Sequence, residues 1–192
     1  MRKIIFLISV MASTILQAQP DSSKTALLLI DIQNFYFAGG ASELVNPVPA
    51  SLNAQKLLLR FRRNNQLVIH IKHGTGTGSD IHPNVAPMDS EKVIVKNDVN
   101  CFLNTDLLDY LNQNGIRKLV ICGMQTHMCV EAATRAAADY GFDCIVIHDA
   151  CATKNLIFEG KTVKAEDVQL STLATLKAYS RLMNTREFLE SE

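Results

Sequence analysis

Three polar side chains, each placed beside an apolar run, are of the types that nucleophilic catalysis needs. Asp31 ends the run LLLID, Lys96 ends VIVK, and Cys129 opens the alanine-rich stretch that follows KLVICGMQT. A thiol attacks carbonyl carbon, a carboxylate takes up the thiol proton, and a lysine beside the carboxylate favours the charged pair. These residues therefore predict a covalent hydrolytic site, provided that the fold brings them together.

Cys129 is expected at the start of a helix, where unpaired N–H groups and the helix dipole stabilise a thiolate. We therefore expect its pKa to lie below the ordinary value of about 8.5. The alternative is a small buried apolar residue, the role expected for Cys122 and Cys144 inside apolar strands. The corresponding alternatives are a strand-end turn residue for Asp31 and a solvated surface lysine for Lys96.

The elements that must position these residues alternate from Thr25 onward. Short apolar runs and longer amphipathic stretches predict a single doubly wound α/β domain, with a mostly parallel sheet and helices on both faces. Ligands bind in such sheets at the carboxyl ends of the strands where the strand order reverses, so we expect the three residues at one edge. The expected strands are 26–32, 66–71, 92–96, 118–122 and 144–148, with a weaker one at 179–183. The expected helices are 48–63, 105–114, 128–140 and 163–177, with Thr105 as an N-cap and Gly115 and Gly141 after helix ends.

The chain has 192 residues, with 19 basic and 19 acidic side chains. This length suits one globular domain, and the balanced charge gives no electrostatic footprint for nucleic acid. Residues 1–18 combine two cations with a short apolar stretch and small residues, which predicts a secretory signal peptide; an anchoring helix is the alternative. We expect cleavage after Ala18, which leaves residues 19–192 as a secreted or periplasmic domain with no membrane association.

From about Thr25 to its end, the chain resembles the isochorismatase-like cysteine hydrolases, which include nicotinamidases and N-carbamoylsarcosine amidohydrolases. The matching segments are ALLLIDIQNFYF (26–37), EKVIVKNDVNCFLNTDLLDYL (91–111) and LVICGMQTHMCVEAATRAAADYGFDCIVIHDACAT (119–153). The resemblance implies the isochorismatase-like hydrolase fold for residues 19–192. It also places the family triad of aspartate, lysine and cysteine on Asp31, Lys96 and Cys129.

The resemblance implies a backbone feature as well, a cis peptide between Met124 and Gln125. The N–H groups of Gln125 and Cys129 would then form an oxyanion hole. Isochorismatases, as the resemblance is drawn, lack the cysteine and cleave a vinyl ether, so Cys129 favours an amidohydrolase. The expected reaction is cleavage of a C–N bond in a small amide, ureido or carbamoyl compound through a Cys129 thioester, without a cofactor.

Three alternatives remain at this stage: a metal-assisted nicotinamidase, an isochorismatase-type hydrolase, and a non-catalytic binding protein with the same fold. The metal reading would use His73, Asp80 and His82 in the long irregular stretch 73–90. The segment IHPNVAP resembles the metal-free members more closely, so we expect no metal. The resemblance also implies a homo-oligomer with pockets near subunit boundaries.

Several further residues have expected places. The candidates for the substrate pocket are Phe35, Phe37, His82 and His127. We expect structural roles for His70 and His148. Cys101 and Cys151 could form a disulfide in an exported protein, but the sequence does not give their separation.

Overall fold

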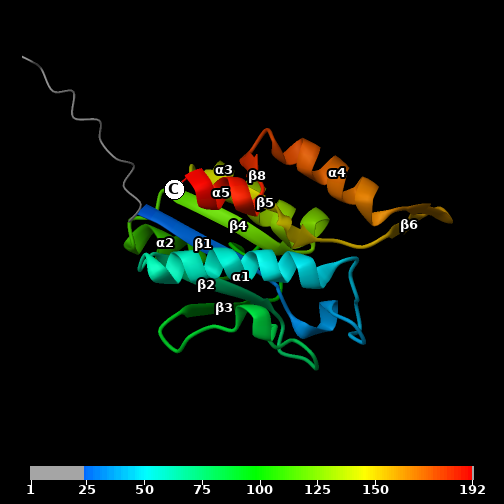
Figure 1. Cartoon of the computed structure of the whole chain (residues 1–192), viewed down its shortest axis with the longest axis horizontal. Coiled ribbons are helices and arrows are strands. Elements are labelled where there is room, and N and C mark those ends of the chain that lie inside the picture. The colour runs from blue at the N-terminus through cyan, green and yellow to red at the C-terminus, as the bar shows by residue number, and fades with distance from the viewer. Residues whose placement is uncertain (1–23, 192) are drawn as a thin grey trace, which may run out of the picture.

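A six-stranded parallel sheet forms the centre of the protein (Figure 1). The computed structural model describes residues 24–191, so the predicted signal peptide lies outside the described residues. The strand order is β3-β2-β1-β4-β5-β8, which confirms the doubly wound α/β fold. The strands are β1 Thr25–Ile30, β2 Leu67–His73, β3 Lys92–Lys96, β4 Lys118–Met124, β5 Asp143–Ala152 and β8 Arg181–Met183.

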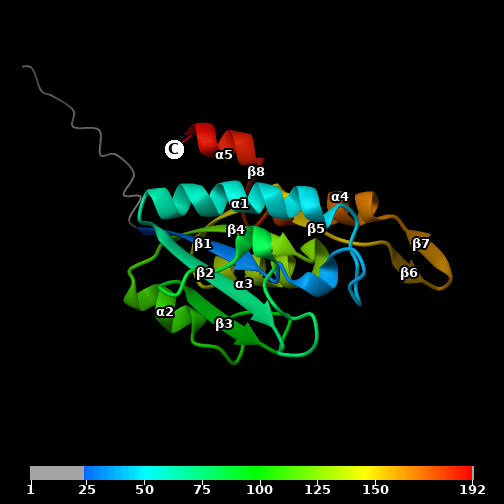
Figure 2. The same ribbon diagram turned by 60° about the horizontal axis from the view of Figure 1, so that its bottom comes forward.

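Helices cover both faces of this sheet. Figures 1 and 2 show α1 (Pro47–Arg63) and α5 (Thr185–Ser191) on one face, with α2 (Leu107–Gln113) and α3 (Glu131–Asp139) on the other. Helix α4 (Ala165–Leu176) packs against α3. Within the described residues, no helix combines the length and the apolar character needed to cross a bilayer.

The central strands are continuous apolar runs because helices bury both of their faces. All six residues of β1 are buried, and β4 is buried from Leu119 to Met124. On α1, Leu57, Leu58 and Phe61 lie in the core, and the ring of Phe61 stacks on Phe188 of α5 at 6.2 Å between centroids. Because β1 and β4 are buried in this way, their carboxyl ends have fixed positions. Asp31 follows the end of β1, and the segment that carries Cys129 follows the end of β4.

Strands β1 and β4 approach closely at the point where the strand order reverses. Gly123 of β4 has a φ of +135°, and a Cβ atom there would lie 2.0 Å from the carbonyl oxygen of Ile30. Only glycine fits this position, because a side chain would meet backbone that cannot move aside. The close approach holds the end of β4 against the end of β1.

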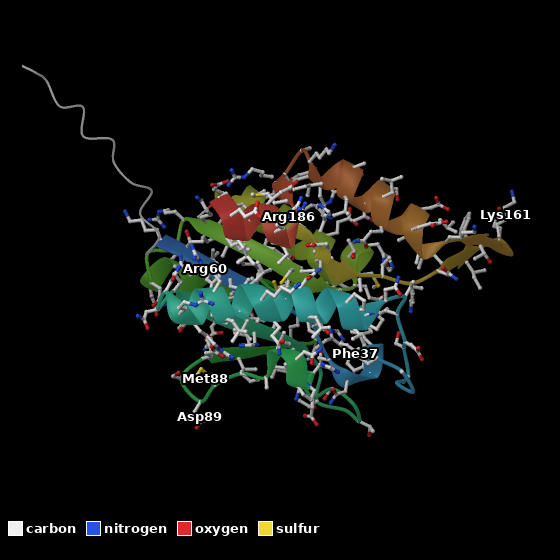
Figure 3. The ribbon with its side chains drawn as sticks, in the orientation of Figure 1. Phe37, Arg60, Met88, Asp89, Lys161 and Arg186 are labelled. Carbon is white, nitrogen blue, oxygen red and sulfur yellow. The ribbon has the colours of Figure 1, made fainter. Side chains whose placement is uncertain are left out.

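Several elements differ from the prediction. The expected helix 128–140 begins instead as a π-helical turn, η4 (Thr126–Val130), before α3. The hairpin of β6 (Leu156–Phe158) and β7 (Lys161–Val163) was not predicted, nor was α5. Thr105 does not occupy the N-cap itself, which is Asp106, although its hydroxyl accepts a hydrogen bond from the N–H of Leu107 at 3.3 Å. Figure 3 shows Lys161 on the hairpin, which projects from the body of the protein.

Two further helical turns lie near the carboxyl ends of the strands, η2 (Asn34–Tyr36) and η3 (Pro83–Val85). The second lies inside the irregular stretch 73–90, which is ordered by contacts with the segment after β1. The N–H of His82 donates to the carbonyl oxygen of Ile32 at 2.8 Å, and the N–H of Asn34 donates to that of Asp80 at 2.9 Å. The long loop is therefore fixed beside the end of β1.

Candidate active site

The structure brings the side chains of Asp31, Lys96 and Cys129 together at the carboxyl edge of the sheet. The Nζ atom of Lys96 lies 2.8 Å from Oδ2 of Asp31 and 3.3 Å from Sγ of Cys129. Asp31 follows β1, Lys96 ends β3, and Cys129 follows β4, so three strands contribute. The long lysine side chain spans the end of β2 to reach the other two residues.

Lys96 is surrounded by more acceptors than it has N–H groups. Besides Asp31 and Cys129, its ammonium contacts Nδ1 of His73 at 3.2 Å and the carbonyl oxygen of Asp98 at 3.1 Å. An ammonium has three donors and no acceptor, so in this contact the nitrogen of His73 is the acceptor. With three N–H groups and four acceptors, at least one N–H group is shared between two of them.

Asp31 and Lys96 form a fully buried ion pair. Both side chains have 0% exposure, and desolvation of this kind is tolerated only with a close opposite charge. Burial raises the pKa of Asp31, against the opposing charge of Lys96. Burial alone would lower the pKa of Lys96, but Asp31 and Cys129 together raise it, so the ammonium stays charged.

The carboxylate of Asp31 keeps capacity to accept a proton. The ammonium of Lys96 contacts Oδ2 at 2.8 Å, and Oδ1 has no hydrogen-bonding partner among the described residues. Its backbone has a φ of +50°, which is uncommon for a residue other than glycine. Such strain persists where the surrounding structure enforces it, often at functional sites.

Cys129 lies in the π-helical turn η4 rather than in a regular helix. The turn is defined by the hydrogen bond from the N–H of Val130 to the carbonyl oxygen of Gln125, at 3.3 Å. Such turns are frequent at functional sites. Burial, together with the negative charge of Asp31, raises the pKa of Cys129 to about 12. The expectation of a lowered pKa was therefore wrong, because burial and a neighbouring carboxylate outweigh the helix terminus.

The peptide bond between Met124 and Gln125 is cis, as the family resemblance implies. Gln125 is the first residue after β4, and its side chain is buried. Its Nε2 atom donates to the hydroxyl of Tyr36 at 3.3 Å. Burial raises the pKa of Tyr36 to about 12, with added contributions from the charges of Asp31 and Cys129. Tyr36 therefore lies near the triad as a neutral phenol.

One residue near the site was missed as a site residue in the sequence, Gln33. The side chain of Gln33 accepts from the N–H of His73 at 2.8 Å and donates to the carbonyl oxygens of His73 and Ser79. It thereby ties the segment after β1 to the segment after β2. The available signal was position, since Gln33 lies two residues after Asp31, which ends the apolar run.

The three candidate metal ligands do not converge. Asp80 is exposed and pairs with Lys72 at 3.5 Å. The ring of His82 stacks on that of Phe37 at 3.7 Å between centroids, and its Nδ1 accepts from the N–H of Asn84. Among the described residues, no group of three histidine, cysteine, aspartate or glutamate side chains could hold a metal ion. His73, the third candidate, instead faces Lys96.

The candidate pocket residues occupy two sides of the site. Phe37 lies at the carboxyl edge of the sheet (Figure 3), and Phe35 packs edge-on against Tyr36 at 4.3 Å between centroids. On the other side, Nδ1 of His127 lies 2.6 Å from the hydroxyl of Thr153. Burial, with the nearby charge of Lys154, lowers the pKa of His127, so this ring is neutral at pH 7. A cavity of about 560 Å³ that includes Thr153 adjoins this region, but no triad residue lines it.

The other four cysteines are buried free thiols. Cys122 and Cys144 lie inside β4 and β5, as predicted for core residues. Cys101 and Cys151 are also unpaired, so the structure contains no disulfide between them. His70 is buried, and its Nε2 lies 3.0 Å from Glu91, which fits the structural role expected for it.

Comparison with known proteins identifies the family. The isochorismatase domain family matches residues 25–175. An uncharacterized isochorismatase family protein of Bacillus subtilis is 43% identical over 178 residues, which cover 86% of this chain and 99% of that protein. A streptothricin hydrolase of Streptomyces noursei is 30% identical over 140 residues, which cover 68% of this chain and 50% of that protein.

A solved structure has the same fold over nearly the whole chain. The crystal structure of a proposed isochorismatase hydrolase from Oleispira antarctica has a TM-score of 0.85 and 40% sequence identity. The match covers 90% of this chain and 100% of that chain. The chain therefore belongs to the isochorismatase family and is a hydrolase.

Proposed function

We propose that this hydrolase cleaves a C–N bond in a small amide, ureido or carbamoyl compound, with Cys129 as the nucleophile. The observation that carries the proposal is the buried cluster in which the Lys96 ammonium lies 2.8 Å from Asp31 and 3.3 Å from the Cys129 sulfur. A thiol, a carboxylate and a cation in contact form the group needed to activate a cysteine. Similarity to a streptothricin hydrolase supports hydrolysis of a small nitrogen-containing compound.

Acylation begins from a neutral thiol, because the pKa of Cys129 is raised to about 12. Asp31 takes the thiol proton as Sγ attacks the carbonyl carbon, and the carbonyl electron pair moves to oxygen. The N–H groups of Gln125 and Cys129 stabilise that oxyanion. When the tetrahedral intermediate collapses, the C–N bond breaks and the leaving nitrogen takes the proton from Asp31.

Deacylation uses the same groups in reverse. Water attacks the thioester while Asp31 accepts its proton, and that proton returns to sulfur as the acid leaves. Lys96 remains charged throughout and stabilises first the carboxylate and then the developing negative charge on sulfur. Because the pair is buried, this attraction is screened much less than it would be at the surface.

The metal-assisted nicotinamidase alternative fits the residues less well. His73, Asp80 and His82 have separate partners in Lys96, Lys72 and Phe37. A catalytic metal site needs converging ligands with an open position.

The test is ammonia release from a panel of small primary amides, ureido compounds and carbamoyl compounds. Wild type is compared with Cys129→Ala and with Cys144→Ala, a matched change at a buried cysteine inside β5. We expect Cys129→Ala to lose turnover and Cys144→Ala to keep it. Hydroxylamine should divert the thioester to a hydroxamate in the wild type. Ammonia release by Cys129→Ala at the wild-type rate would show that covalent catalysis is wrong.

We also propose that residues 1–18 direct export of the protein and that the domain works as a homo-oligomer. The cation pair and apolar stretch of the first residues support export. Fractionation of cells that express the full chain tests the first point, and cytoplasmic retention at full length would contradict it. Light scattering on the purified domain tests the second, and a monomer mass at micromolar concentration would contradict it.

A further inference from the structure

The side-chain amide of Gln125 is only partly satisfied. Its Nε2 atom donates to the Tyr36 hydroxyl at 3.3 Å. Its Oε1 atom is buried and has no hydrogen-bonding partner among the described residues, and the whole residue is 6% exposed. An unsatisfied buried polar atom is destabilising and rare in native structures. This acceptor therefore needs an explanation.

The position of Gln125 suggests one. Its carbonyl oxygen accepts the N–H groups of Met128 and Val130, so it forms the base of the turn that carries Cys129. The Oε1 and Nε2 atoms belong to one planar amide, so the free acceptor lies beside the Tyr36 hydroxyl. That hydroxyl is close enough to Asp31 and Cys129 for their charges to affect its pKa. The acceptor thus belongs to the residue on which the turn of the nucleophile is built, and it lies beside the Tyr36 hydroxyl.

Tyr36 fixes the orientation of this acceptor. Because its pKa is raised to about 12, the hydroxyl stays protonated and does not repel Oε1 as a phenolate would. The hydroxyl accepts from Nε2, which leaves Oε1 directed away from that bond. The phenol ring is itself held against Phe35.

We propose that Gln125 Oε1 accepts a hydrogen bond from the nitrogen of the scissile amide, and that Tyr36 positions Gln125 for this contact. The proposal rests on the function proposed above. It narrows the substrate class to amides, carbamoyl groups and ureido groups that keep an N–H on the leaving nitrogen. Esters and fully substituted amides would leave Oε1 buried and unsatisfied, so they are disfavoured.

Alkylation of Cys129 tests the contact without an identified substrate. The two probes are iodoacetamide, which has an N–H beside its carbonyl, and 2-iodo-N,N-dimethylacetamide, which has none. The rate at Cys129 is measured by peptide mass spectrometry, and each rate is divided by the rate with glutathione to remove intrinsic reactivity. We expect the wild type to favour iodoacetamide by about three- to tenfold, the range for one hydrogen bond.

Three variants and a control separate the contact from general effects. Gln125→Leu removes the acceptor and should bring the ratio close to one. Tyr36→Phe should lower the ratio to a value between that of the wild type and one, because the Gln125 amide loses its hydrogen bond to the Tyr36 hydroxyl. Gln125→Glu keeps an acceptor at the same length, so the ratio should persist even if both rates fall through the added charge. Gln113→Leu, at an exposed glutamine at the end of α2, should leave the ratio unchanged.

A wild-type ratio near or below one would overturn the inference and needs no folded variant. An unchanged ratio in folded Gln125→Leu would also overturn it. Failure of Cys129 to react with either probe would overturn it too, since an amide would then lack access to the sulfur. The proposed function is judged separately by ammonia release, so a protein that shows the ratio but hydrolyses no amide would refute the function alone.

Discussion

Replacing Asp31 with asparagine should abolish hydrolysis and yet make the Cys129 thiol easier to ionise. In the wild type, burial and the Asp31 charge raise the pKa of Cys129 to about 12, while Lys96 lowers it. Asparagine keeps the shape but removes the negative charge. The sulfur then faces only the ammonium of Lys96, at 3.3 Å.

The size of the effect follows from Coulomb's law. Two unit charges about 4 Å apart interact by about 4 kcal/mol at an effective dielectric constant of about 20. At about 1.4 kcal/mol for each pKa unit, this is about three units. The thiol pKa should therefore fall from about 12 to about 9. Hydrolysis should still be lost, because asparagine cannot accept and return the proton.

The assay is the ultraviolet absorbance of the thiolate, followed against pH. Each protein is measured as a difference from its Cys129→Ala counterpart, which cancels tyrosine and the other cysteines. Asp98→Asn is the matched control, because the side chain of Asp98 bonds Asn104 and only its carbonyl oxygen contacts Lys96. A thiol in Asp31→Asn that titrates at or above the wild-type pKa would refute the electrostatic reasoning.

Three further changes test stability. Lys96→Met leaves Asp31 buried without a counter-ion, so the free energy of unfolding measured in urea should fall by about 3–5 kcal/mol. An unchanged free energy of unfolding would mean that the pair is not buried in solution. Burial alone would raise the pKa of Glu91, but its hydrogen bonds lower that pKa to about 2. The contribution of Glu91 to the free energy of unfolding is therefore complete above about pH 4.5 and is lost as the pH falls toward 2. The free energy of unfolding of the wild type should fall by up to about 3 kcal/mol over that pH range, and that of Glu91→Gln should fall by less. Gly123→Ala should prevent folding or lower the free energy of unfolding by several kcal/mol. Gly141 lies in open space at a φ of +85°, so Gly141→Ala should lower the free energy of unfolding, measured by thermal unfolding, by about 1 kcal/mol.

The sheet was predictable because strands that are buried on both faces are continuous apolar runs in the sequence. Runs such as residues 92–96 coincide with a strand, and the others differ mainly at their ends. The convergence of Asp31, Lys96 and Cys129 followed from one topological rule, since polar residues after parallel strands share one edge. Neither result required knowledge of side-chain contacts.

The projecting hairpin was not predictable in the same way. Ile157 and Phe158 are 76% and 73% exposed, so their apolar character does not report burial. Two strands of three residues each also give too short a pattern to establish a period. The contacts of Gln33 and Gln125 were missed for another reason, since their partners lie 40 and 89 residues away in the chain.

The pKa of Cys129 is set by the tertiary structure more than by the local helix terminus. A helix terminus acts on its own first turn, and its effect can be read from the sequence. Burial and the charge of Asp31 depend on the tertiary structure, and here they are larger. The resting site is consequently a neutral thiol beside a buried ion pair, not a preformed thiolate. In such a site Cys129 reacts when a bound electrophile, either a substrate carbonyl or a small alkylating agent, accepts electron density from sulfur, because only then does proton transfer to Asp31 become favourable. The same arrangement limits oxidation of the cysteine, since oxidants react with the thiolate.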